Sequence, residues 1–178
     1  DTVVAGNARV DLLSPRGRVS FAAEAKELRD RYGKYIVFNT NYGQINSHLN
    51  ISGNVKTVNG RLHVVSYGDL QLGQVDSGND IDIGVYGMRS DLNGPITADN
   101  DVFYQAPIAQ TNLKPAAVIT GDSVELQVRN FQGVNANGLP YTSAAQQPDA
   151  QIVTDFLELH AYGTVNAPIA GNANFLTN

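Results

Sequence analysis

Apolar and polar residues alternate along much of this chain, with the period of two that is typical of β-strands. The clearest case is residues 123–131 (SVELQVRNF), where Val124, Leu126 and Val128 fall on one side and polar side chains fall on the other. This segment predicts a half-buried strand. The same pattern predicts further strands at 2–4, 8–13, 35–39, 44–51, 55–58, 61–65, 70–75, 81–88, 102–105 and 117–120.

Turn sequences separate these strands. Asn59-Gly60 stands between 55–58 and 61–65. Both of its residues tolerate a positive φ, so Asn-Gly is the strongest short signal for a β-hairpin. We therefore predict a hairpin here. Further turn sequences occur at 77–79, 93–95, 121–122 and 137–140, and the sequence shows no evident internal repeat.

One segment has helical character. Ser20 precedes FAAEAKELRDRY, in which Glu27 and Arg31 stand four residues apart, and Gly33 follows it. A capping serine, helix-forming residues and an i,i+4 charge pair predict a short helix over about 20–32. Residues 151–162 fit either a helix or a strand, and their β-branched start favours a strand.

Eight to ten short strands, regular turns and one short helix predict an all-β jelly-roll sandwich or barrel. An immunoglobulin-like sandwich is the alternative, although the chain has no cysteine or tryptophan for its hallmark core. We expect a single β-barrel domain at 1–162, with the helical insertion at about 20–32. Residues 163–178 carry no charged side chain. They predict an assembly arm with Ile169, Phe175 and Leu176 as its contact residues.

Charge is concentrated near the start of the sequence. Residues 1–35 hold seven of the twelve basic side chains, and the net charge of the chain is −5. The more neutral remainder is expected to contact other protein molecules, since charge normally keeps free surfaces apart. The negative balance argues against nucleic-acid binding. No apolar run reaches the roughly 18–20 residues of a membrane span.

No motif is strong enough to indicate catalysis. His48, His63 and His160 do not have the spacing that places two imidazoles on one metal from one element. Neither Ser123 nor any other serine stands in the G-x-S-x-G pattern of a nucleophile elbow. We therefore expect no enzymatic activity, no catalytic residue, no metal and no cofactor.

Two charged groups are candidates for binding. Asp76, Asp80 and Asp82 lie close together in DSGNDID, and a smaller acidic group follows at 99–101. They are weak candidates for a cation, because Asp and Asn more often bond their own backbone in turns. Arg16 and Arg18 are candidates for contact with phosphate or lipid headgroups, against the alternative of a solvated helix with local ion pairs.

The layout resembles the small single jelly-roll major capsid proteins of internal-membrane icosahedral viruses of the haloarchaeal and Thermus type. The segments that carry the resemblance are 8–13, 20–32, 55–65, 123–131 and 165–178. It implies a structural virion protein, located in the capsid, that builds an icosahedral shell through barrel and arm contacts. Its implied partners are other copies of itself, a second, larger coat protein and an internal membrane.

The alternative function is a secreted or surface carbohydrate-binding or adhesin β-sandwich module. Such a module needs exposed aromatic side chains in a row. The eight tyrosines are scattered along the sequence, so no aromatic platform is evident at this level.

Overall fold

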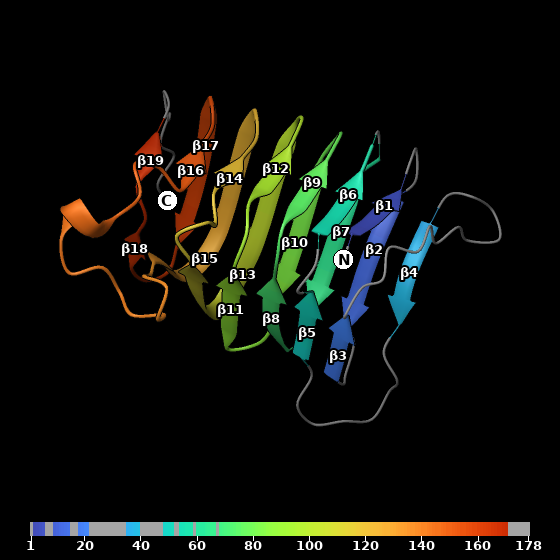
Figure 1. The fold of residues 1–178 in the computed structure, drawn as a ribbon, viewed down its shortest axis with the longest axis horizontal. Coiled ribbons are helices and arrows are strands. Elements are labelled where there is room, and N and C mark those ends of the chain that lie inside the picture. The colour runs from blue at the N-terminus through green and yellow to red at the C-terminus, as the bar shows by residue number, and fades with distance from the viewer. Residues whose placement is uncertain are drawn as a thin grey trace.

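In the computed structural model, the chain winds into a parallel β-solenoid of about six turns (Figure 1). The structure describes residues 2–5, 9–14, 18–21, 35–39, 48–51, 54–58, 60–66 and 68–170, and their side chains from Asn50 onward. We call each turn of the solenoid a coil. Within the described ranges there is no helix with the length and apolar character needed to cross a membrane.

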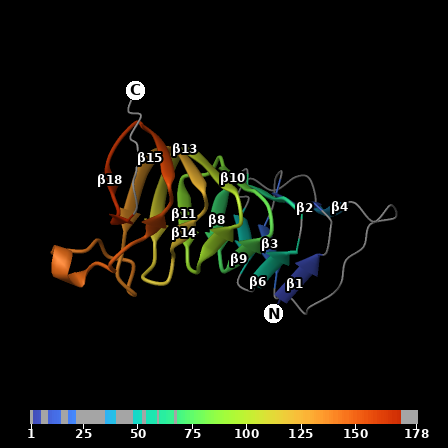
Figure 2. The same cartoon turned by 90° about the horizontal axis from the view of Figure 1, so that it is seen from above.

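Seven short strands form one side of the solenoid, sheet A. They are β1 (Thr2–Ala5), β6 (Asn54–Thr57), β9 (Val75–Ser77), β12 (Ile96–Ala98), β14 (Ile119–Thr120), β16 (Ile152–Val153) and β19 (Ile169–Ala170). The views of Figures 1 and 2 agree that these strands lie side by side, from the blue N-terminal coil to the red C-terminal one.

Twelve strands form sheet B, which bends to make the other two sides. Those on its first side, side B1, are β2 (Arg9–Ser14), β4 (Tyr35–Asn39), β7 (Leu62–Ser66), β10 (Ile81–Val85) and β17 (Phe156–Ala161). Those on its second side, side B2, are β3 (Arg18–Phe21), β5 (His48–Ile51), β8 (Asp69–Leu72), β11 (Arg89–Leu92) and β18 (Val165–Asn166). Two long strands, β13 (Asp101–Leu113) and β15 (Ser123–Gly133), contribute to both sides.

In sheet A, each coil places an apolar residue in register with the equivalent apolar residue of the preceding coil. The members of this row are Val55, Val75, Ile96, Ile119, Ile152 and Ile169. The successive steps between them are 20, 21, 23, 33 and 17 residues. The chain is therefore an internal repeat of uneven length, which corrects the sequence-based statement that no repeat is present.

The jelly-roll prediction is wrong, because every strand pairing in the described part of the chain is parallel. The long β13–β15 pair, for example, runs from Asp101↔Ser123 to Leu113↔Gly133. A jelly roll is built from antiparallel strands. The strand positions were largely correct, but alternation reports only that one face is buried. A solenoid strand is also buried on one face and solvated on the other, so its sequence alternates in the same way.

The hairpin prediction at Asn59-Gly60 is also wrong. Its two flanking strands belong to different sheets: β6 pairs with β1 and β9, whereas β7 pairs with β2 and β10. The turn is a corner at which the chain passes from sheet A to side B1. Gly60 is buried there, and the chain continues into β7 in the other sheet instead of pairing β7 with β6.

The expected helix and arm fall partly outside the described residues. Ser20 ends up within β3, and residues 22–32 are not described. A 3₁₀-helix, η1 (Ala144–Gln146), lies in the long loop before β16. Residues 151–162 contain two strands, β16 and β17, and no helix, as favoured from sequence. The first part of the expected arm continues the solenoid, because β18 pairs with β15 and β19 pairs with β16.

The core fills the space between the three sides. A row of branched apolar side chains on side B1 is at most 1% exposed, and each member stacks on the residue one coil away. The row contains Leu62, Ile81, Val102, Val124 and Leu157. Burying each such side chain is worth about 1.5–3 kcal/mol. The predicted inward set Val124, Leu126 and Val128 is confirmed, with each side chain fully buried.

Among the residues with described side chains, Tyr104 is the one tyrosine in the buried core. Its ring packs edge-on against Phe131, with ring centroids 6.0 Å apart. Its hydroxyl lies 2.9 Å from Thr111 Oγ1 in a buried hydrogen bond. Burial raises the pKa of Tyr104 to about 12, because a phenolate would be isolated from water.

Candidate functional site

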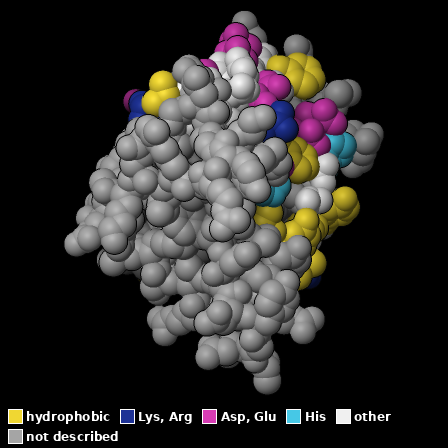
Figure 3. Space-filling model, turned by 90° about the vertical axis from the view of Figure 1, so that its right-hand side faces the viewer, with side chains coloured by type: hydrophobic (Ala, Val, Ile, Leu, Met, Phe, Trp, Pro, Cys, Tyr) yellow, Lys and Arg dark blue, Asp and Glu magenta, His cyan; other side chains and the backbone are white. Residues whose placement is uncertain are grey.

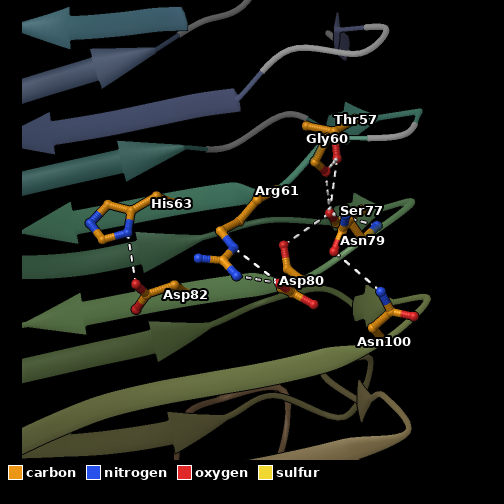
Figure 4. Close-up of polar contacts among 9 residues, drawn as sticks. All are labelled: Thr57, Gly60, Arg61, His63, Ser77, Asn79, Asp80, Asp82 and Asn100. Carbon is orange, nitrogen blue, oxygen red and sulfur yellow. Dashed lines mark hydrogen bonds and ion pairs between the residues drawn. The ribbon is translucent and has the colours of Figure 1, made fainter.

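The corner between sheet A and side B1 is held by hydroxyl and amide side chains (Figure 4). Ser77 Oγ donates to the Gly60 carbonyl at 2.8 Å and lies 2.9 Å from Thr57 Oγ1. Asn100 Nδ2 donates to Asn79 Oδ1 at 3.2 Å. These bonds link each corner to the corner of the next coil. The network therefore satisfies buried backbone groups and fixes how the coils stack.

The three candidate carboxylates each face a basic side chain on the preceding coil. Asp76 pairs with Lys56 at 2.6 Å, and the hydrogen bond raises the pKa of Lys56. Asp80 accepts two bonds from the Arg61 guanidinium. The Lys56–Asp76 pair joins β6 to β9. The Arg61–Asp80 pair joins the corners that follow these strands (Figure 4).

Asp82 has the third basic partner, with His63 Nδ1 2.8 Å from Asp82 Oδ2. The three candidate carboxylates thus lie along the outer surface, each with its own partner, instead of converging on a common point. Figure 3 shows acidic side chains beside basic and histidine ones on this flank. Exposed pairs of this kind contribute little to stability, because water and salt screen the attraction. A cation at Asp76, Asp80 and Asp82 stays a prediction.

Of the remaining sequence candidates, Arg18 and Ile169 belong to described strands. Arg18 is the first residue of β3, whereas Arg16, Phe175 and Leu176 lie outside the described residues. Ile169 packs against the core of its own chain and stacks on Ile152.

Side B2 carries a chain of hydrogen bonds across its outer surface. Arg89 Nε donates to Asp91 Oδ2 at 2.8 Å, and Asn112 Nδ2 donates to Asp91 Oδ1 at 2.8 Å. Gln132 Nε2 then donates to Asn112 Oδ1 at 3.2 Å. Asp91 is only 5% exposed, and these two donors satisfy its carboxylate, since a buried charge without them would be strongly destabilising.

Side B1 carries a second row of amides and, beside it, an acidic group. Gln105 Nε2 donates to Gln127 Oε1 at 3.2 Å, and Gln127 Nε2 donates to Glu125 Oε1 at 2.8 Å. Glu158 lies in register with Glu125 on the next strand, and His160 Nε2 lies 2.7 Å from Glu158 Oε1. Among the described residues, Glu125, Glu158 and His160 are acidic and histidine side chains close enough together to hold one metal ion.

Exposed apolar side chains lie along the corner between sides B1 and B2. We call this corner, at residues 86–88, 107–109, 129 and 162–164, the Tyr-Gly corner, because Tyr86-Gly87 and Tyr162-Gly163 both occupy it. Its large apolar side chains are 43–72% exposed. They are Tyr86, Met88, Ile108 and Tyr162.

The tyrosines are held outward by close packing behind them. A Cβ on Gly87 would lie 2.2 Å from the Gly68 carbonyl carbon, and one on Gly163 would lie 2.5 Å from the Arg129 carbonyl oxygen. Glycine at these positions lets each corner rest on the backbone of the coil before it. The Tyr86 hydroxyl donates to Gln105 Oε1 at 3.3 Å, which ties the corner to the amide row of side B1.

Comparison with known proteins adds no family to this description. No protein-family model matches the chain, and no curated protein or solved structure matches it. The functional argument therefore depends on the geometry of the surface.

Sequence reasoning missed both the Tyr-Gly corner and the Glu125–Glu158–His160 group. A signal was present, since Tyr-Gly occurs five times, at 32–33, 42–43, 67–68, 86–87 and 162–163, although the tyrosine of the first three pairs lies outside the described residues. The acidic group gave no such signal. Glu125 and Glu158 are neighbours only because a long insertion is looped out between their coils.

Proposed function

We propose that this chain is a non-catalytic binding module of a surface or secreted protein, and that it binds an extended, neutral glycan along the Tyr-Gly corner. The observation that carries this is the exposure of Tyr86 and Tyr162, at 43% and 72%, on the same corner. They stand three strand spacings apart, about 14 Å. Two of the eight tyrosines, far apart in the sequence, thus lie on the same corner.

The chemistry beside the corner supports a sugar ligand. Sugar rings offer apolar C–H faces for aromatic side chains and hydroxyls for hydrogen bonds. The side-chain amides of Gln105 and Gln127 lie next to the corner on side B1, and each amide has more donors and acceptors than its protein bonds use. The net charge of −5 disfavours a polyanionic ligand.

The charged side chains on the outer surface have a structural role, and this supports a module without catalytic activity. The carboxylates along sheet A and side B1 are engaged by bases of the preceding coil. Such pairing fixes side chains for stacking instead of leaving an acid and a base facing a cleft. The capsid expectation depended on a jelly roll, and because the parallel coils overturn that premise we do not carry it further.

The test is binding of neutral polysaccharides by affinity electrophoresis and by calorimetry. We expect the double variant Tyr86→Ala, Tyr162→Ala to lose at least about tenfold in affinity, since aromatic contacts dominate such surfaces. Val58→Ala is the matched control, because Val58 is 46% exposed at a different corner and should not affect binding. Unchanged binding by the double variant would refute the glycan surface.

A second outcome would also contradict the proposal. If the intact chain binds no neutral glycan but self-associates through Tyr86 and Tyr162 in sedimentation experiments, the corner is a protein interface. Tyrosine and methionine are enriched at protein interfaces, so this measurement separates the two classes of partner directly.

A further inference from the structure

Glu125, Glu158 and His160 form a compact group on two neighbouring strands of side B1. Glu125 on β15 lies directly beside Glu158 on β17, and His160 follows two residues later on the same face. One ligand atom from each side chain lies within 4.8 Å of the other two. The parallel register, and not a local sequence motif, creates this group.

The charges of this group are arranged differently from those of the other acidic residues on the face. Asp80 and Asp82 each face a base one coil away, whereas Glu125 faces a second carboxylate. The partners that the structure gives these two glutamates are the Gln127 amide and His160. Like charges placed directly across neighbouring strands are destabilising, and a bound cation would reverse the sign of that interaction.

We propose that Glu125, Glu158 and His160 bind a divalent transition-metal ion of the Zn²⁺ type. Two carboxylate oxygens and one imidazole nitrogen suit zinc, whereas calcium prefers six to eight oxygen ligands. The Glu158 and His160 side chains are 33% and 23% exposed, so the ion has access from solvent and the remaining coordination position is open to water. This site adjoins the proposed glycan surface through the Gln127–Glu125 hydrogen bond, but none of its three ligand residues belongs to that surface.

Zinc binding is measured by calorimetry on the intact chain, with Co²⁺ absorption as a report of the coordination geometry. We expect one equivalent to bind and the melting temperature to rise with ZnCl₂ concentration. His160→Ala and Glu125→Gln should each weaken binding at least about tenfold. The control is His63→Ala, because His63 makes the same kind of contact with a single carboxylate, Asp82, and this variant should bind normally.

Glu125→Gln provides a second reading that does not require metal. Without zinc, its melting temperature should be higher than that of the wild-type chain, because the like-charge contact with Glu158 is removed. With zinc, the order should reverse. Absence of binding, equal binding by His160→Ala, or loss of binding in His63→Ala would each overturn the proposed site, the last two by showing an adventitious ion only.

Discussion

Single residues in this solenoid act mainly through the neighbour one coil away. Asp80 is neutralised by Arg61, which is 19 positions earlier in the sequence, and Asn79 is bonded by Asn100 from the coil that follows. Local sequence therefore says little about what a surface residue does. A carboxylate that resembles a calcium ligand in DSGNDID becomes, in three dimensions, half of an ion pair that also aligns two coils.

Tyr104 makes the stability of the core depend on alkaline pH. The unfolded phenol loses its proton near pH 10, whereas the folded one keeps it until about pH 12. The contribution of the neutral buried phenol is therefore fully present below pH 10 and is lost as the pH rises to 12. We expect about 2–3 kcal/mol of unfolding free energy to be lost over this window.

The measurement is denaturant unfolding of wild type and Tyr104→Phe from pH 7 to 11.5. At neutral pH the variant should be less stable by about 1 kcal/mol, because Thr111 loses its partner. The difference should shrink and then reverse as the pH rises. Parallel pH profiles of the two proteins would show that Tyr104 does not titrate in this way.

At the scale of elements, the sequence determined where strands lie but not how they pair. The alternation in β15 correctly gave Val124, Leu126 and Val128 as its inward face. Two strands pair antiparallel if the chain folds back on itself and parallel if it continues around the solenoid. The Asn59-Gly60 sequence is compatible with both. Register depends on residues that are 17 to 33 positions apart, which is why Glu125 and Glu158 were not predicted as neighbours.

Alanine substitutions at two glycines test how closely the coils pack at the Tyr-Gly corner. Gly87→Ala places a methyl group 2.2 Å from the Gly68 backbone, whereas at Gly84 the nearest atom is the Tyr86 ring at 3.5 Å. Neither glycine has a positive φ, so the comparison isolates packing. We expect Gly87→Ala to cost roughly 1–3 kcal/mol and Gly84→Ala to be neutral or stabilising by up to about 1 kcal/mol.

Thermal unfolding of both variants measures this difference. If Gly87→Ala melts with wild-type stability, the coils adjust at the Tyr-Gly corner more easily than the backbone contact implies. The proposed alignment of Tyr86 and Tyr162 would then lack its rigid support.

At the scale of the whole molecule, each coil contacts mainly the coils on either side of it, so stability should be close to a sum of coil and interface contributions. Removal of one complete coil, residues 75–95, joins residue 74 to Ile96, which occupies the same register position as Val75. We expect the shortened chain to fold with a β-rich circular dichroism spectrum and a shorter particle in small-angle scattering.

The matched control removes residues 75–90, which leaves the chain out of register. That variant should be unfolded or aggregated, because a slip of register places apolar side chains on the solvated face. Equal behaviour of the two deletions would argue against stacking by register.

The loop at residues 134–151 has a broader consequence. It lengthens the step from Ile119 to Ile152 to 33 residues, compared with 20, 21 and 23 for the three steps before it, yet these two residues remain in register and their side chains are fully buried. Length added at a corner is therefore absorbed outside the stack. Such a scaffold can accept inserted residues in its corner loops, and with them a new binding specificity, without a change in the packing of its core.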